Sequence, residues 1–189
     1  MKLDQPGLFD IHGMPDGFRY APNVIDGAEE AHLVARFAEL PFKEFEFHGF
    51  IGRRRIVSFG WRYDFNGGGL HRVAPVPSFL LAVREQAASF AELAPDHLQH
   101  VLITEYRPGA AIGWHRDRAN FADVVGVSLL GPCSFRMRRK VGRGWQRASL
   151  LLDRRSAYVL RGPSRDQWEH SIPAVDELRY SITFRSLRT

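Results

Sequence analysis

The residue types with the clearest chemistry lie in the stretch VLITEYRPGAAIGWHRD, which ends at Asp117, and in two later segments. His115 and Asp117 are separated by one residue, so in a β-strand, where side chains alternate, both point to the same face. An imidazole and a carboxylate side by side can hold a metal ion, although two ligands rarely suffice. The later segment WEHSI supplies a third candidate ligand, His170.

The last of these segments, RYSITFR, alternates as a strand does. Alternation places Arg179, Ser181, Thr183 and Arg185 on one face, and Tyr180, Ile182 and Phe184 on the other. Two histidines and one carboxylate form the ligand set of non-haem Fe(II) oxygenases, which leaves positions on the metal open for a cosubstrate and O₂. An arginine suits the capture of the free carboxylate of a dicarboxylic 2-oxo acid, because its planar guanidinium binds a carboxylate through two parallel bonds.

The segments HRD, WEHSI and RYSITFR together resemble the signature of the AlkB family of Fe(II)- and 2-oxoglutarate-dependent dioxygenases. The resemblance is close over residues 100–189 and looser from Arg53 to Phe65. It implies Fe(II) held by His115, Asp117 and His170, 2-oxoglutarate as cosubstrate, and O₂ as oxidant. It also implies oxidative demethylation of N-alkylated nucleic-acid bases, as in DNA or RNA alkylation repair, with release of formaldehyde, succinate and CO₂.

The resemblance extends to the residues that would hold 2-oxoglutarate. Arg179 corresponds to the family's carboxylate-binding arginine, and Tyr106 is expected to help hold the same carboxylate. Thr104 lies on the same strand face as Tyr106, and Ser181 lies on the face of Arg179. Family members usually carry asparagine in place of Thr104 and often in place of Ser181; both replacements keep a hydroxyl donor with a shorter reach.

A second set of residues is expected around the substrate. By resemblance, Arg185 lies near the aspartate ligand, although an ordinary ion pair is an alternative role for it. Trp168 shares a strand face with His170 and is expected either to line the cavity or to pack in the core. The aromatic stretch from Phe42 to Phe65 is similar to the family's nucleotide-recognition lid, with a structural hairpin as the alternative. The lid residues expected to face substrate are Arg55, Phe59, Trp61 and Tyr63.

The elements that would position these residues are mainly strands. Asp26, with Glu29 three residues later, predicts a helix N-terminus, and Pro41 ends that helix. A second helix is predicted from Pro77 to Leu93, after which short β-rich runs follow one another. We therefore expect an α+β fold, a double-stranded β-helix (jelly roll) with flanking helices. Trp114, opposite to His115 on its strand, is expected in the core.

Length and composition indicate one domain over residues 1–189, with helices and the lid in 1–95 and the catalytic jelly roll in 96–189. Cys133 is the single cysteine and no apolar run reaches membrane-spanning length, so we expect a cytoplasmic protein that does not enter the membrane. We expect it to be a monomer.

Positive charge gathers in the second half of the chain. Residues 96–189 carry 16 basic and 9 acidic side chains, whereas residues 1–95 carry 10 and 12. Six of the basic residues fall in one hairpin-like stretch: Arg136, Arg138, Arg139, Lys140, Arg143 and Arg147. Such a field attracts a polyanion, which favours nucleic acid as the partner, while a solvated arginine-rich surface is the alternative.

Two other functions stay open on the sequence alone. One is a 2-oxoglutarate oxygenase that acts on a protein or a small molecule. The other is a non-catalytic barrel that binds nucleic acid through its charge, and for it the joint presence of HRD, His170 and RYSITFR has no purpose.

Overall fold

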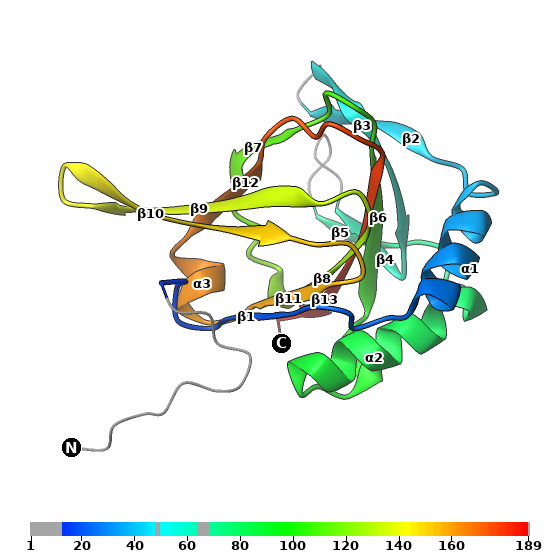
Figure 1. Cartoon of the computed structure of the whole chain (residues 1–189). Coiled ribbons are helices and arrows are strands. Elements are labelled where there is room, and N and C mark those ends of the chain that lie inside the picture. Colours follow the sequence, from blue (N-terminus) through cyan, green and yellow to red (C-terminus); the bar gives the residue numbers. More distant parts are fainter. Residues whose placement is uncertain (1–12, 48–49, 64–68, 189) are drawn as a thin grey trace.

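A computed structural model of the chain describes residues 13–47, 50–63 and 69–188. The described residues form thirteen strands and a few short helices, and Figure 1 shows how these elements are arranged in layers. The helical segments are α1 (Gly27–Phe37), η1 (Ser78–Leu80), α2 (Leu81–Ala91), η2 (Pro95–His97) and α3 (Pro163–Asp166). The strands are β1 (Phe18–Ala21), β2 (Lys43–Phe47), β3 (Phe50–Phe59), β4 (Trp61–Tyr63), β5 (Leu70–Arg72), β6 (His100–Tyr106), β7 (Ile112–His115), β8 (Phe121–Leu130), β9 (Cys133–Val141), β10 (Gly144–Leu152), β11 (Ala157–Leu160), β12 (Glu169–Ile172) and β13 (Arg179–Leu187).

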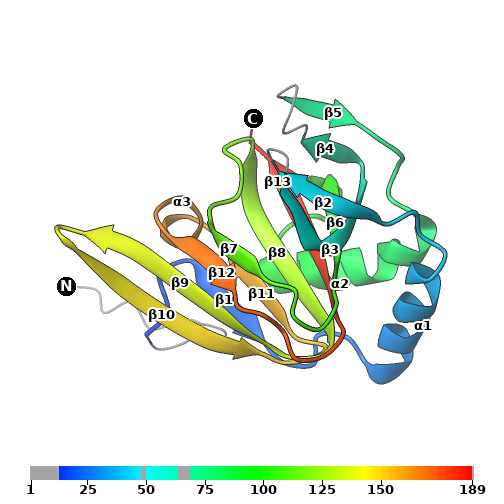
Figure 2. The same ribbon diagram turned by 90° about the horizontal axis from the view of Figure 1, so that it is seen from above.

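Two antiparallel sheets form the body of the protein. The major sheet has seven strands in the order β1-β11-β8-β13-β6-β3-β2, and the minor sheet has four in the order β10-β9-β12-β7. Strands β4 and β5 form a separate hairpin. Figure 2 shows the minor sheet on one side of the major sheet and the helices α1 and α2 on the other. This confirms the expected jelly roll with flanking helices.

The helices α1 and α2 cover the outer face of the major sheet. The side chain of Asp26 accepts a hydrogen bond from the backbone N–H of Glu29 at 2.8 Å, as the predicted N-cap requires. Leu33 and Phe37 of α1 pack in one core with Ile182 and Phe184 of β13. The other face of β13 therefore points inward, between the two sheets.

A second apolar core lies between the sheets and is contributed by both. Phe18, Tyr158 and Leu160 of the major sheet pack there with Phe135 and Met137 of the minor sheet. The space between the sheets is lined by this apolar cluster on one side. Along β6 and β13 it is lined by buried polar side chains.

The structure differs from two sequence-based expectations of the fold. Strands β1, β2 and β3 belong to the major sheet, so the first 95 residues contribute to the jelly roll as well as covering it. Trp114 is partly exposed rather than buried. The helices cover only the major sheet, so the outer face of the minor sheet, where Trp114 lies, stays open. Among the described residues, no helix is long and apolar enough to cross a membrane.

Candidate metal centre

Strands β7 and β12 bring two histidines together. They pair antiparallel with His170 directly opposite His115, and the two ring centroids are 4.2 Å apart. Phe135 of β9 stacks on the other side of His170, with ring centroids 5.3 Å apart. The pairing register of the minor sheet thus places both imidazoles at one point of the interior.

Asp117 reaches the same point from outside the strand. Strand β7 ends at His115, so the alternation expected for His115 and Asp117 does not extend to the carboxylate, which lies in the following loop. Its Oδ2 nevertheless lies 3.7 Å from Nε2 of His170. The structure therefore brings all three predicted ligands together, with the aspartate placed by a loop rather than by strand pleating.

The protonation states of these groups suit metal binding. Nδ1 of His115 lies 2.9 Å from the carbonyl oxygen of Gly113, which can only accept, so Nδ1 carries the proton and Nε2 keeps a lone pair. Burial, followed by the neighbouring His115, lowers the pKa of His170 to about 3. Burial also lowers the pKa of His115. Both imidazoles are thus neutral at physiological pH, which is the form that coordinates a metal.

The carboxylate of Asp117 has one oxygen that no described group satisfies. Oδ1 accepts hydrogen bonds from Arg185, whereas Oδ2 is buried and has no hydrogen-bond partner. Among the described residues, no three His, Cys, Asp or Glu side chains are already gathered as a metal site would hold them. The unpaired oxygen still points to a cation, because a buried carboxylate oxygen without a donor or a metal is costly. The residue types present, two neutral imidazoles and a carboxylate with one unpartnered oxygen, fit a divalent metal such as Fe(II).

Arg179 lies deep between the sheets with donors to spare. Its side chain is 1% exposed, and its Nη2 donates to Oγ of Ser128 at 2.8 Å. Its Nε and Nη1 are buried without a hydrogen-bond partner in the described part of the chain. The ring of Tyr106, its cross-strand neighbour, lies 5.0 Å from the guanidinium carbon. A buried guanidinium with two open donors is a receptor for a carboxylate.

Three small hydroxyl residues lie beside Arg179. Ser181 of β13 is paired with Thr104 of β6 on one side and with Ser128 of β8 on the other. All three are buried. The sequence pointed to Thr104 and Ser181 but not to Ser128, because its position depends on the register between β8 and β13.

Arg185, which was predicted to lie near Asp117, and His100, which was not predicted in the site, support Asp117. Nε and Nη2 of Arg185 lie 2.7 and 2.6 Å from Oδ1 of Asp117. Its Nη1 lies 3.3 Å from Nδ1 of His100, whose ring contacts that of Phe121 in a tilted arrangement with centroids 4.7 Å apart. Burial and the charge of Arg185 hold the pKa of His100 well below its usual value, so His100 is neutral and accepts the bond. His100 lies four and six residues before Thr104 and Tyr106, so strand alternation places all three on one face. This spacing was the signal that could have identified His100.

The match to known proteins decides what this site belongs to. Residues 17–185 match the model of the 2OG-Fe(II) oxygenase superfamily, which covers most of the chain. The chain belongs to this superfamily, in its AlkB family. It is therefore a dioxygenase that uses Fe(II), 2-oxoglutarate and O₂.

Relatives of this AlkB-family chain carry names from nucleic-acid biology. It is 26% identical over 215 residues to an alkylated DNA repair protein ALKBH8 homolog of Arabidopsis thaliana, covering 99% of this chain and 57% of that protein. It is 26% identical over 172 residues to the mouse tRNA (carboxymethyluridine(34)-5-O)-methyltransferase ALKBH8, covering 86% of this chain and 25% of that protein. The chain thus spans only part of the length of these relatives.

A solved structure supports the fold. The AlkB-family chain superimposes on OsALKBH1 with a TM-score of 0.72, over 92% of this chain and 98% of that one, at 14% sequence identity. At this identity the likeness speaks for the shared jelly roll and not for a shared substrate.

On the substrate side, the AlkB-family chain brings one predicted lid residue to the metal centre. Tyr63 of β4 packs under Arg118, whose guanidinium carbon lies 4.6 Å from the ring centroid. Arg118 directly follows Asp117 in the loop. Trp61, in the same hairpin, packs instead on Arg72 of β5, with the guanidinium carbon 5.3 Å away. Residues 48, 49, 64 and 65 of the expected lid lie outside the described residues.

Two predicted lid residues point away from the site. Arg55 donates two hydrogen bonds to the carboxylate of Glu105, at 2.8 and 2.6 Å, and Glu105 lies on the helix-facing side of β6. Phe59 is buried in the core beneath the helices. The neighbour of Arg55, Arg54, pairs with Tyr106 and lies on the inward face instead. Adjacent residues of a strand point to opposite faces, so Arg54 and Arg55 lie on different sides of β3. The sequence alone does not specify which of the two faces inward.

Trp168 packs inside the jelly roll rather than at an open surface. It is 3% exposed and belongs to the same apolar core as Phe135, the residue that stacks on His170. Arg139 covers it, with the guanidinium carbon 5.2 Å from the ring centroid. Of the two roles open to Trp168 from sequence, the packing supports the core role.

Proposed function

We propose that this dioxygenase oxidatively removes N-alkyl groups from nucleic-acid bases. The observation that carries the proposal is the unpaired, buried Oδ2 of Asp117 facing His170, together with the unsatisfied guanidinium of Arg179 deeper in the same interior. The nucleic-acid half is supported by the names of its relatives and by the basic second half of the chain.

In this proposal, His115, Asp117 and His170 hold the Fe(II) ion. Arg179 binds the distal carboxylate of 2-oxoglutarate through its two open donors, while Tyr106, Thr104 and Ser181 line the same pocket. When bound there, Fe(II) with 2-oxoglutarate and O₂ would supply the oxidising chemistry that converts a substrate N-methyl group to N-hydroxymethyl, with succinate and CO₂ formed from 2-oxoglutarate; the hydroxymethyl group would then leave as formaldehyde.

The remaining residues keep the site correctly charged. Arg185 donates to Oδ1 of Asp117 and leaves Oδ2 without a hydrogen-bond partner among the described residues. Burial by itself raises the pKa of Asp117, but the charge of Arg185 holds it well below its usual value. The carboxylate is thus anionic at physiological pH, and the ring of Phe135 stacks on that of His170.

The substrate side of the proposal uses the hairpin β4–β5. Tyr63, packed with the loop that follows Asp117, and Trp61 nearby present aromatic surface on which an unstacked base can lie. Arg185 would lie between that base and the metal. Arg55 and Phe59 take no part, because they point to the helix-covered face.

The test is turnover on a panel of single-stranded DNA and RNA oligonucleotides, each with one N-methylated base. The purified chain, with Fe(II), 2-oxoglutarate and O₂, should release formaldehyde and succinate in equal amounts from at least one member. An Asp117→Ala variant should release neither. Succinate formation that no oligonucleotide stimulates would contradict the nucleic-acid assignment and point to a protein or small-molecule substrate.

A further inference from the structure

The outer face of the minor sheet carries a set of basic and aromatic side chains that the catalytic site does not use. We call it the basic-aromatic face; its members are Trp114 of β7, Arg136, Arg138 and Lys140 of β9, and Trp145 and Arg147 of β10. Strand register places Lys140 opposite Trp145 and Arg138 opposite Arg147, so the members of both strands share one side. The hairpin formed by β9 and β10 extends beyond the rest of the protein (Figures 1 and 2).

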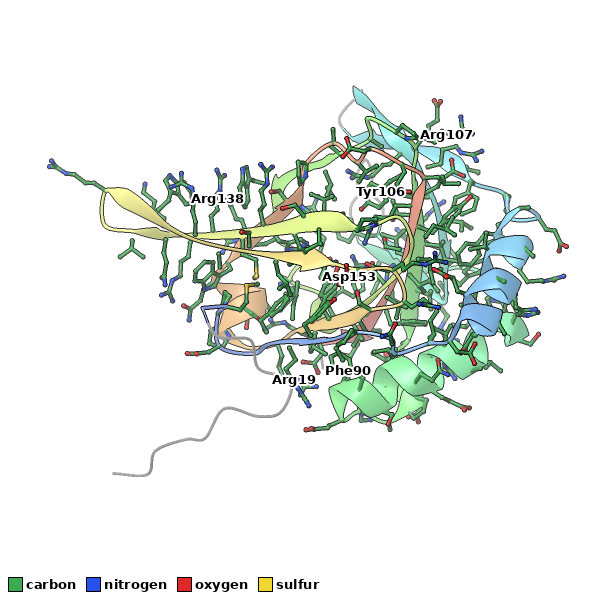
Figure 3. All side chains as sticks on the ribbon, viewed as in Figure 1. Arg19, Phe90, Tyr106, Arg107, Arg138 and Asp153 are labelled. Carbon is green, nitrogen blue, oxygen red and sulfur yellow. The ribbon has the colours of Figure 1, made fainter. Side chains whose placement is uncertain are left out.

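Arg138 lies at the centre of this face, between two indoles. Its guanidinium carbon is 4.4 Å from the ring centroid of Trp114 and 4.2 Å from that of Trp145. Its Nε donates to Glu169 at 2.7 Å. Figure 3 shows the Arg138 side chain on the side of β9 that faces away from β1. The guanidinium of Arg138 is thus held by the hydrogen bond to Glu169, and it contacts both indole rings.

The periphery of the face is exposed and strongly cationic. Three exposed cations lie here: Lys140 and Arg147 of the face, and Arg143 in the turn between β9 and β10. None of them forms an ion pair with another residue that the structure describes. Trp145 is 40% exposed. Leu151, which the same register places on this side of the hairpin, is also exposed, so two of the five large exposed hydrophobic residues in the described ranges lie on this side. Charge and apolar surface at one place match a ligand that has both phosphates and bases.

The face is placed back to back with the metal centre. Trp114 directly precedes His115 on β7, and Glu169 directly precedes His170 on β12. Strand β7 is the edge of the minor sheet. A chain-like ligand held on the outer face therefore passes around a single edge strand to reach the histidines on the inner face.

We propose that the basic-aromatic face binds single-stranded nucleic acid. Lys140, Arg143 and Arg147 contact phosphates, and a base stacks on the open side of Trp145. Stacking on an indole suits a single strand, whose bases are free, better than a duplex. The choice of ligand rests on the proposed function, since a nucleic-acid substrate is what makes a second contact region useful. Acidic side chains are few here, which favours a polyanion over a cationic partner.

The experiment measures binding of fluorescently labelled, unmethylated oligo-dT and oligo-rU by anisotropy, without iron or 2-oxoglutarate. Trp145→Ala should weaken binding about tenfold, as expected for one lost base stack, and Trp145→Phe should retain most of the affinity. Arg143→Ala with Arg147→Ala should lower the slope of log affinity against log salt concentration by about 1.4, which corresponds to two phosphate contacts. Each altered residue is exposed, and circular dichroism checks that the variants fold.

The matched control is Arg36→Ala with Lys43→Ala, which removes the same charge from exposed positions on α1 and β2. It should leave both the affinity and the salt slope nearly unchanged. Equal losses in the control and in the hairpin variants would overturn the proposal, as would a Trp145→Ala variant that binds like the unaltered protein. Displacement of the oligonucleotide by polyglutamate at equal charge would overturn the choice of nucleic acid. Failure of the proposed function appears in the formaldehyde assay instead, which this binding assay does not use.

Discussion

Arg185 divides the carboxylate of Asp117 into two oxygens with different roles. Its Nε and Nη2 both approach Oδ1, at 2.7 and 2.6 Å, while Oδ2 stays unpaired and lies 3.7 Å from Nε2 of His170. One oxygen is thus fixed by the guanidinium and the other is directed at the histidine. This arrangement orients a metal ligand before any metal binds.

Replacing Arg185 should therefore weaken metal binding without touching a ligand. In Arg185→Met, Asp117 loses its main stabilising charge, so its pKa rises and its orientation is no longer fixed. We expect the affinity for Fe(II) to fall about 10–100-fold, and Arg185→Lys, which keeps the charge, to fall less. Anaerobic metal titration of the folded variants measures this. Equal affinity in Arg185→Met and the unaltered protein would show that Asp117 needs no such support.

Ser128 should act on 2-oxoglutarate through Arg179. Its Oγ accepts from Nη2 of Arg179 at 2.8 Å and so sets the direction of the two remaining donors. In Ser128→Ala we expect the KM for 2-oxoglutarate to rise about fivefold, the value of one hydrogen bond, with kcat little changed. Ser156→Ala is the control, because that buried hydroxyl bonds the carbonyl of Asp153 instead. A KM unchanged in Ser128→Ala, or raised equally in Ser156→Ala, would argue against this role.

Arg55 should matter for stability rather than for substrate. It donates two hydrogen bonds to the buried Glu105, which also accepts from Arg107 and Tyr180. Arg55→Ala should lower the free energy of unfolding by about 1–2 kcal/mol and leave oligonucleotide turnover intact. Arg107→Ala, which removes an exposed partner of the same carboxylate, should cost less than about 1 kcal/mol. Lost oligonucleotide affinity at unchanged stability would instead place Arg55 in the substrate pocket.

The metal-free protein should lose stability as the medium becomes acidic. The pKa of His170 in the folded protein is about 3, below its ordinary value of 6.5, and burial also holds that of His100 well below this value. Between these limits the unfolded chain binds protons that the folded protein does not, so stability falls as the pH drops from about 6.5 toward 3. Urea unfolding at a series of pH values measures this. His100→Gln should make the dependence shallower, and an unchanged dependence in this variant would contradict the assignment.

Local patterns predicted much of this molecule from sequence. The N-cap at Asp26 and the alternation of Arg179, Ser181 and Arg185 depend on neighbouring residues, so they are readable from the chain itself. The three candidate ligands follow from residue types and from the resemblance of HRD, WEHSI and RYSITFR to the AlkB family signature, although Asp117 is placed by a loop and not by the strand.

What the sequence did not predict depends on pairing between distant strands. Ser128 and His100 reach the site through the registers of β8 and β6 with β13. Arg54 faces inward and Arg55 outward because of the register between β3 and β6. Trp114 is partly exposed because, among the described residues, no helix packs on the outer face of the minor sheet, which a local pattern does not specify.

The central claim is that His115, Asp117 and His170 jointly bind the iron ion that 2-oxoglutarate chelates. The most direct measurement is the visible charge-transfer absorption that 2-oxoglutarate shows on Fe(II), recorded anaerobically during titration with iron. The unaltered chain and His97→Ala, which changes an exposed histidine outside the site, should develop the band with one equivalent of iron. Folded Asp117→Ala and His170→Ala should not. A band of the same strength and affinity in those two variants would contradict the account.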